Sequence, residues 1–304
     1  MKYDLIIIGA GTAGLTASIY AACSGLKVLC IENQTCGGQI VSTYDIINYP
    51  GFKNISGLDF SQKLQSQAVD LGVDIKTEQI SKMDLEQKNK TIVTDNFEYK
   101  TKAVIIATGT RRRELGCDGE ESFRGRGVTY CATCDGRFFK NKVVGIVGGG
   151  NTAVDDAIYL SNICKHVYVI HRRDEFRASG RSVELMKQKE NITLKLNSVV
   201  DSIEGNNLME NVILSNTKTN EKTSLPLNGL FVAIGSMPNS KEFSNWVDLD
   251  EQGYIVANED CVTKTSGVFV AGDVRTKKVR QLVTAASDGS VAALAASEYI
   301  NHIK

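Results

Sequence analysis

The sequence lacks a net charge of either sign, because 35 lysines and arginines balance 35 aspartates and glutamates. Without a basic excess, nucleic acid is not expected as the principal partner. Long hydrophobic runs are also missing: a stretch such as Ala103–Ala107 is far too short to span a bilayer, so no membrane partner is expected. Residues Met1–Gly9 predict a buried strand entering a glycine turn, not a signal peptide. We therefore expect a cytoplasmic protein, and 304 residues suffice for about two domains.

Cysteine occurs eight times, but a chain of this length does not suggest a disulfide framework. Six of the cysteines stand alone, and a single cysteine usually packs as a small apolar side chain. The exception is the close pair Cys131 and Cys134. In a reducing compartment such a pair is more often catalytic or metal-binding than structural.

What the sequence does contain is an internal repeat of a nucleotide-binding pattern. Residues 4–32 and 143–171 each hold an apolar run, a glycine turn, a stretch of helical character and a second apolar run. In such a β-α-β unit the first glycine allows a tight turn, the second lets a pyrophosphate approach, and a small third residue lets helix and strand pack. The two copies are Gly9-x-Gly11-x-x-Gly14 and Gly148-x-Gly150-x-x-Ala153. One copy alone is a weak signal, whereas two in the right context indicate two dinucleotide-binding units.

The residue at the end of the second strand distinguishes the two nucleotides. A carboxylate there accepts hydrogen bonds from ribose hydroxyls, whereas basic residues accommodate a 2′-phosphate. Glu32 in the first copy suits FAD or NAD. The second copy has His171, Arg172 and Arg173, with Arg177 nearby, which suits the 2′-phosphate of NADPH. The alternative is that these basic residues form a solvated loop. Their position at the expected ribose site favours binding of the 2′-phosphate instead.

The remaining segments predict how each half is built. Each half is expected to be a parallel sheet with an antiparallel strand layer, including a strand over Thr193–Val200 in the second half. A helix is expected over Ser56–Gly72. The tail, a strand at Val268–Asp273 and a helical stretch near Arg280–Ile300, could return to the first sheet and make the first domain discontinuous. Periodicity alone leaves that return open.

Taken together, these motifs resemble the low-molecular-weight thioredoxin reductases over nearly the whole chain. Any one motif could arise by chance, but the ordered set is specific. Besides the two glycine patterns and the arginine segment, the set comprises Gly37-Gly38-Gln39, Asn48-Tyr49-Pro50-Gly51-Phe52, Ala107-Thr108-Gly109, Cys131-Ala132-Thr133-Cys134-Asp135-Gly136, Gly272-Asp273 and Arg280-Gln281.

The resemblance implies an α/β fold of two Rossmann-like, three-layer dinucleotide-binding domains, the second inserted in the first. Residues 1–113 and 241–304 would form the FAD domain, and residues 114–240 the NADPH domain with the cysteine pair. The implied FAD contacts are Gly9, Gly11, Gly14, Glu32, Gly38, Gln39, Asn48, Asp273, Arg280 and Gln281. The implied NADPH contacts are Gly148, Gly150, Asn151, Thr152, Ala153, His171, Arg172, Arg173 and Arg177.

The resemblance also implies the activity of a thioredoxin-disulfide reductase. NADPH would reduce FAD, the reduced flavin would open the disulfide at Cys134, and Cys131 would attack oxidised thioredoxin as a thiolate. Asp135 would donate or accept the proton of the dithiol. Nicotinamide and disulfide would reach the flavin in turn, by a domain rotation through Arg113–Glu114 and Pro238–Lys241. A homodimer with thioredoxin or a thioredoxin-like protein as partner is expected.

The alternative for the cysteine pair is half of a zinc site, which would need two further ligands. The chain has only three histidines, and His166 and His171 flank the second strand of a nucleotide unit. Metal binding by these histidines would be incompatible with NADPH binding at the same strand, so no metal is expected.

Other functions remain to be distinguished. A non-enzymatic nucleotide-responsive protein would keep both glycine patterns but have no use for the cysteine pair. Relatives that serve ferredoxin lack either the NADPH pattern or the cysteine pair, and this chain has both. Two departures from the family pattern are Cys36, directly before Gly37, and Cys117 in the connecting segment. An exposed thiol at either place would be sensitive to oxidation, and the sequence leaves the role of both open.

Overall fold

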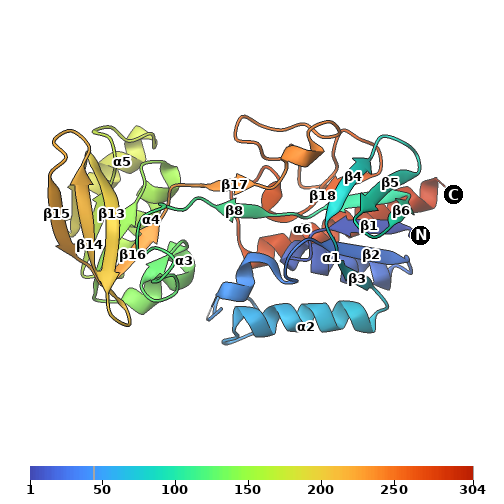
Figure 1. Cartoon of the computed structure of the whole chain (residues 1–304), viewed down its shortest axis with the longest axis horizontal. Coiled ribbons are helices and arrows are strands. Elements are labelled where there is room, and N and C mark those ends of the chain that lie inside the picture. The colour runs from blue at the N-terminus through green and yellow to red at the C-terminus, as the bar shows by residue number, and fades with distance from the viewer. Residues whose placement is uncertain (44, 304) are drawn as a thin grey trace. The chain divides into compact units, whose positions relative to one another are not determined.

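The computed structural model describes residues 1–43 and 45–303; Tyr44 and Lys304, both within the predicted FAD domain, lie outside the described residues. The chain forms two compact units (Figure 1). Unit 1 comprises Met1–Arg111 and Met237–Lys304, and unit 2 comprises Arg112–Ser236. Unit 2 is therefore an insertion in unit 1, and each unit is a mixed α/β fold with one parallel sheet.

The parallel sheet of unit 1 has five strands, in the order β18-β7-β1-β2-β3. Their bounds are Val268–Val270, Ala103–Ile106, Leu5–Ile8, Val28–Glu32 and Asp74–Thr77. The return of the tail, which the sequence left open, is confirmed, because β18 pairs in parallel with β7. The helices of unit 1 are α1 (Thr12–Cys23), α2 (Gly57–Asp70), α6 (Leu282–His302) and the short turns η1 (Gly38–Ser42), η3 (Lys241–Phe243) and η4 (Gly272–Val274).

Unit 1 has three layers because its strands are apolar on both faces. Side chains such as Leu5 and Ile7 pack with α1 and α6, while Ile6 and Ile8 of the same strand point the other way. The second face is covered by an antiparallel sheet, β4-β5-β6, with bounds Ile80–Asp84, Lys90–Thr94 and Glu98–Thr101. The predicted helix near Ser56 is α2, and the Oγ of Ser56 caps it by accepting from the backbone N–H of Asp59 at 3.0 Å.

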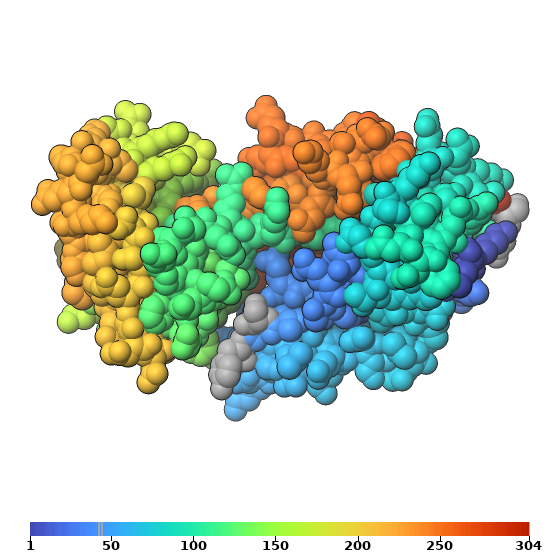
Figure 2. Space-filling view, in the orientation of Figure 1, coloured from blue at the N-terminus to red at the C-terminus, as the bar shows by residue number. Residues whose placement is uncertain are grey.

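Unit 2 repeats this design. Its parallel sheet has the order β12-β11-β10-β16-β9, with bounds Ile192–Lys195, His166–Ile170, Val143–Val147, Gly229–Val232 and Val128–Thr129. One face packs on α4 (Asn151–Ser161) and α5 (Gly180–Lys187), and the other on the antiparallel sheet β13-β14-β15. That sheet comprises Ser198–Gly205, Met209–Asn216 and Lys222–Pro226. Figure 2 shows it, in yellow, on the surface of the molecule.

One predicted strand is divided in the structure. The expected strand over Thr193–Val200 is two strands, β12 in the parallel sheet and β13 in the antiparallel sheet. Asn197 lies between them with φ of 49°, a left-handed conformation that asparagine tolerates and that breaks an extended run. The prediction of one continuous strand was therefore wrong at this position.

The two segments that join the units are short strands that pair with each other. They are β8 (Thr110–Arg112) and β17 (Ser236–Pro238). Unit 2 also contains the short helix α3 (Ala132–Asp135) and the turn η2 (Gly136–Phe139). Among the described residues, no helix combines the length and apolar character that crossing a membrane requires.

Candidate functional site

The first glycine turn of unit 1 lies at the carboxyl end of β1. A Cβ on Gly9 would lie 2.5 Å from the carbonyl oxygen of Ala107, and a Cβ on Gly14 would lie 1.8 Å from that of Gly9. Both positions therefore require glycine. Gly11 is the N-cap of α1, and in the described structure no side chain caps this helix. The first backbone N–H groups of α1 thus face an anion-binding position of the kind that holds a pyrophosphate.

Glu32 is held beside this turn at the end of β2. Its Oε2 accepts a hydrogen bond from the backbone N–H of Ala10 at 2.9 Å, and its Oε1 accepts from the next two backbone N–H groups. Gly37 pairs with Gly11, and the Cα of Gly38 lies 4.0 Å from where a Cβ on Gly11 would be. The structure therefore brings the predicted carboxylate and the second glycine pair to the first glycine turn.

The C-terminal segment of unit 1 reaches the same turn. Gly272 has φ of 80°, and a Cβ there would lie 2.8 Å from the Cβ of Ala13 in α1. Asp273 follows directly in η4. The guanidinium of Arg280 lies 4.1 Å from the centre of the Tyr254 ring, and its Nε donates to the carbonyl oxygen of Asp273 at 3.4 Å.

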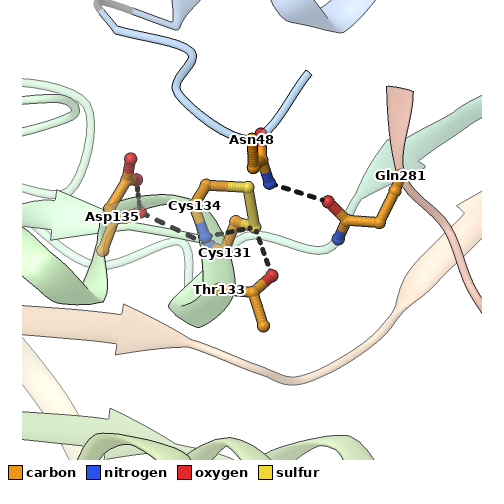
Figure 3. Close-up of a disulfide and its surroundings, with 7 residues drawn as sticks. Asn48, Cys131, Thr133, Cys134, Asp135 and Gln281 are labelled. Atoms are coloured by element: carbon orange, nitrogen blue, oxygen red, sulfur yellow. Dashed lines mark hydrogen bonds between the residues drawn. A yellow bond between two sulfur atoms is a disulfide. The ribbon is translucent and has the colours of Figure 1, made fainter. Parts of the chain in front are cut away.

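Asn48, Gln281 and Gln39 complete the predicted residues of unit 1. The Nδ2 of Asn48 donates to the Oε1 of Gln281 at 3.2 Å (Figure 3). Gln281 is the N-cap of α6, where it forms a reciprocal capping box with Thr284. The Nε2 of Gln39 donates to the hydroxyl of Thr110 at 3.2 Å. These hydrogen bonds hold the three amide side chains in fixed orientations.

The glycine turn of unit 2 has the same construction. A Cβ on Gly148 would lie 2.4 Å from the carbonyl oxygen of Ala233 and 2.6 Å from the Cβ of Ala153. Gly150 is the N-cap of α4, and within the described residues no atom lies within 4 Å of its hypothetical Cβ. The helix has no side-chain cap there. Asn151 and Thr152 form its exposed first turn. The space over Gly150 suits the approach of a second pyrophosphate.

The arginines predicted to bind the 2′-phosphate are exposed. Arg172, Arg173 and Arg177 take part in no ion pair within residues 1–43 and 45–303. The neighbouring carboxylate, Asp174, is instead bound by Lys218 at 2.8 Å, which lowers the pKa of Asp174. The three guanidinium groups are thus available to a phosphate.

His171 has a different environment from these arginines. Its ring is buried and stacks on Phe176, with 5.1 Å between the ring centres, and its Nε2 lies 3.0 Å from the carbonyl oxygen of Glu175. A Cβ on Gly149 would lie 2.1 Å from a ring carbon, and the backbone N–H of Arg177 donates to the Gly149 carbonyl at 2.8 Å. Burial, with the nearby arginines, lowers the pKa of His171. The neutral ring therefore supports the segment that carries the arginines.

Cys131 and Cys134 form a disulfide at the start of α3, with an S–S distance of 2.10 Å (Figure 3). The backbone N–H of Cys134 donates to the Sγ of Cys131 at 3.2 Å, and the hydroxyl oxygen of Thr133 lies 3.5 Å from the same sulfur. Hydrogen-bond donors at a sulfur favour its charged form. These donors are of the kind that favour a thiolate, which is the form of cysteine that attacks disulfides.

Asp135 is the titratable carboxyl next to the disulfide. Burial raises its pKa, although the hydroxyl of Thr129 and the charges of Arg112 and Arg137 act in the opposite direction. A carboxyl with a raised pKa exchanges protons closer to neutral pH than an exposed one. Its position directly after Cys134 suits proton transfer with the dithiol.

Cys36 and Cys117, the two departures from the family pattern, are half-buried thiols. Burial raises the pKa of each to about 11. At neutral pH both are therefore protonated and weakly nucleophilic. Within the part of the chain that the structure describes, no three His, Cys, Asp or Glu side chains are placed to hold a metal ion. The Nε2 of His166 instead lies 2.9 Å from the hydroxyl oxygen of Thr193.

Comparison with known proteins agrees with this geometry. Residues 3–289 match the model of the pyridine nucleotide-disulphide oxidoreductases. The chain belongs to this family. It is 41% identical over 305 residues to a thioredoxin reductase of Peptoclostridium acidaminophilum, covering 98% of this chain and 97% of the relative. It is 40% identical over 303 residues to a thioredoxin reductase of Bacillus subtilis, covering 99% and 96%.

Solved structures of the same family have the same fold. The crystal structure of thioredoxin reductase from Streptococcus pyogenes is 38% identical in sequence and superposes with a TM-score of 0.94, over 99% of each chain. Thioredoxin reductase from Giardia duodenalis is 34% identical and superposes with a TM-score of 0.93, also over 99% of each chain.

Two residues that contact predicted site residues of this oxidoreductase were not predicted from the sequence. The hydroxyl of Thr129 bonds to the carboxyl of Asp135, and the carboxylate of Asp288 in α6 accepts from the backbone N–H of Gly272 at 3.0 Å. Asp288 carries a usable signal, since an acidic residue in an alanine-rich helical stretch must find a partner if it is buried. Thr129 carries none, because a threonine before a cysteine pair is unremarkable without knowledge of its neighbours.

Proposed function

We propose that this chain is an NADPH-dependent thioredoxin-disulfide reductase that uses FAD and the Cys131–Cys134 disulfide. The observation that carries the proposal is the disulfide itself, which lies in the same unit as a glycine turn and an exposed arginine cluster. The names of the relatives support the same activity. A nucleotide-responsive binding protein has no use for this disulfide. The disulfide therefore favours the enzyme over the binding protein.

FAD belongs to unit 1 in this proposal. The fit rests on two observations: α1 begins at an uncapped glycine turn, and Glu32 is fixed beside it as an acceptor for ribose hydroxyls. When bound, FAD supplies the redox centre between NADPH and the disulfide. The residues proposed to hold it are Gly9, Gly11, Gly14, Glu32, Gly38, Gln39, Asn48, Asp273, Arg280 and Gln281.

NADPH belongs to unit 2. Its pyrophosphate would bind over Gly150 at the start of α4, and its 2′-phosphate would bind the exposed guanidinium groups of Arg172, Arg173 and Arg177. His171 supports that segment from beneath. Gly148, Asn151, Thr152 and Ala153 complete the proposed turn. We therefore propose that the chain is divided by function at the predicted boundaries. The FAD domain comprises residues 1–113 and 241–304, and the NADPH domain comprises residues 114–240.

The cysteine pair then carries out the disulfide exchange. Two electrons and two protons convert the disulfide into a dithiol, and the Cys131 thiolate attacks one sulfur of oxidised thioredoxin. A mixed disulfide forms, and Cys134 attacks the Cys131 sulfur. The bond between Cys131 and thioredoxin breaks, so thioredoxin leaves as a dithiol and the Cys131–Cys134 disulfide forms again. Asp135 takes up or supplies the proton at Cys134.

The proposal includes motion and assembly. Unit 2 carries both the NADPH turn and the disulfide, so each must reach the flavin in turn, and rotation through the paired strands β8 and β17 provides this. We also propose a homodimer in the cytoplasm, which the family resemblance implies. Light scattering on the purified protein measures the mass and tests the dimer.

The experiment that tests the function uses the purified holoenzyme. It should be yellow; anaerobic NADPH should bleach the flavin absorbance, and added oxidised thioredoxin should gain free thiols. Cys131→Ser and Cys134→Ser should each abolish thiol formation and leave the bleaching by NADPH intact. Cys117→Ser, a half-buried thiol in the same unit, is the control and should leave both signals unchanged. A preparation that takes up no flavin, or serine variants with full thiol formation, would contradict the proposal.

A further inference from the structure

The hydroxyl of Thr129 connects two groups of the redox site. Thr129 is the last residue of strand β9 and its side chain is buried. Its Oγ1 accepts a hydrogen bond from the backbone N–H of Cys131 at 3.4 Å and donates its own hydrogen to the Oδ2 of Asp135. Figure 3 shows Asp135 beside the disulfide. A single oxygen atom thus joins the start of the cysteine pair to the carboxyl that follows it.

The contacts of the Thr129 hydroxyl suit an ionised Asp135. The N–H of Cys131 can only donate, so it occupies a lone pair of the Thr129 oxygen. The hydroxyl keeps its one hydrogen, which it donates to the Oδ2 of ionised Asp135. It also keeps a second lone pair, which can accept from a protonated Oδ2. The bond in which Thr129 donates is therefore made with the carboxylate, and it favours that form of Asp135.

We propose that Thr129 is a positioning residue that holds the Asp135 carboxylate beside the cysteine pair for proton exchange with the dithiol. The proposal rests on the proposed function, in which this carboxyl serves the dithiol. When Cys134 attacks the mixed disulfide, its thiol proton passes to the Asp135 carboxylate, a bond forms between the sulfurs of Cys134 and Cys131, and the thioredoxin sulfur leaves with its electron pair. The proton then moves from Asp135 to that leaving sulfur or to water, so atoms and electrons balance.

The charged groups around Asp135 come from two other elements. Arg112 lies in β8 and Arg137 in η2, and both favour the ionised carboxylate, as does the Thr129 hydroxyl. Burial acts against ionisation and outweighs them. Removing the hydroxyl takes away one donor to the carboxylate and leaves the burial in place. The pKa of Asp135 should therefore rise further.

The test measures the pKa of Asp135 directly in the oxidised holoenzyme. Aspartate labelled with ¹³C at the carboxyl carbon is titrated by NMR, and the signal that disappears in Asp135→Asn is assigned to Asp135. Thr129→Val, which keeps the shape but lacks the hydroxyl, should raise this pKa by about 1. Thr129→Ser, which keeps the hydroxyl, should restore the wild-type value. Thr193→Val, which removes a hydroxyl elsewhere in unit 2, should also leave it unchanged.

A second measurement separates this inference from the proposed function. In Thr129→Val, the pH at which thioredoxin turnover reaches half its plateau should shift upward by the same amount, with the plateau retained. If thioredoxin is not reduced at all while the NMR shift occurs, the function fails and the role of Thr129 stands. Equal Asp135 pKa values in wild type and Thr129→Val would overturn the role of Thr129. If the valine variant does not fold, Thr129→Ala provides the same comparison.

Discussion

Both carboxylate oxygens of Asp288 lie 2.8 Å from guanidinium nitrogens of Arg275, in a buried ion pair of unit 1. The Oδ2 of Asp288 also accepts from the Nζ of Lys277 at 2.8 Å and from the backbone N–H of Gly272 at 3.0 Å. Burial by itself would raise the pKa of Asp288, but the two cations outweigh it and hold the pKa below its usual range. This one carboxylate thereby ties α6 to the turn that precedes Asp273.

Replacing Asp288 with alanine should destabilise unit 1. Lys277 would lose its counter-charge and Arg275 would keep only the exposed Glu259 at 3.4 Å. Breaking a buried ion pair in this way typically costs about 3–5 kcal/mol. Thermal unfolding should show a lower Tm, and flavin should be retained poorly because Gly272 loses its anchor. Replacing all three members, as Arg275→Met, Lys277→Met and Asp288→Leu, should recover much of the Tm because no unpaired charge remains. A Tm for Asp288→Ala equal to wild type would show that the cluster does not stabilise the unit.

Neutralising the arginine cluster should change nucleotide choice. With Arg172, Arg173 and Arg177 replaced by glutamine, the affinity for NADP⁺ should fall by roughly 100-fold, about 3 kcal/mol, because charge-assisted bonds to the 2′-phosphate are lost. Binding of NAD⁺ should change by less than about threefold. Calorimetry on the holoenzyme measures both, and Arg181→Gln, an exposed arginine on α5, serves as the control. Equal losses for the two nucleotides would count against a 2′-phosphate site.

Gly150 and Gly148 should respond differently to alanine. The space over Gly150 is open and its φ of −92° suits any residue, so Gly150→Ala should keep the wild-type Tm. The added methyl would nevertheless occupy the approach of the pyrophosphate, and NADP⁺ affinity should fall at least about tenfold. Gly148→Ala should lower the Tm, because its Cβ would lie 2.4 Å from the carbonyl oxygen of Ala233. Unchanged NADP⁺ binding in folded Gly150→Ala would place the pyrophosphate elsewhere.

Asp156 on α4 should limit stability at neutral pH. Burial and the neighbouring charge of Asp155 raise its pKa to about 6. Since the folded-state pKa lies above the unfolded value, its stabilising effect is present below about pH 4 and is lost as the pH rises through about 6. Asp156→Asn should therefore raise the Tm at pH 7.5 by about 2–4 °C and have little effect at pH 4. A Tm difference that does not depend on pH would show that Asp156 titrates normally.

Local steric requirements are the part of this protein that the sequence reveals best. The glycine turns were predicted because a backbone clash at Gly9 or Gly148 depends on residues that the β-α-β pattern itself positions. The two apolar faces of strands such as Leu5–Ile8 likewise follow from their continuous hydrophobic run. The family resemblance added the order of the remaining motifs.

Contacts between distant segments were not accessible in the same way. The burial of His171 depends on Gly149 and Phe176, which are near neighbours only once the turn and the arginine segment have folded together. The ion pair of Arg275 with Asp288 depends on the direction in which α6 leaves η4. The break at Asn197 was missed because the strands on either side have the same apolar character, although they belong to different sheets.

The insertion of unit 2 sets the order in which the chain completes its folding during synthesis. When the ribosome has made Ser236, every strand of unit 2 exists, but unit 1 still lacks β18 and α6. Domains generally fold as units once their residues have emerged. At that stage of synthesis, the nascent chain therefore holds a complete unit 2 and an incomplete unit 1. Unit 1 is completed only when α6 has been made and covers α1.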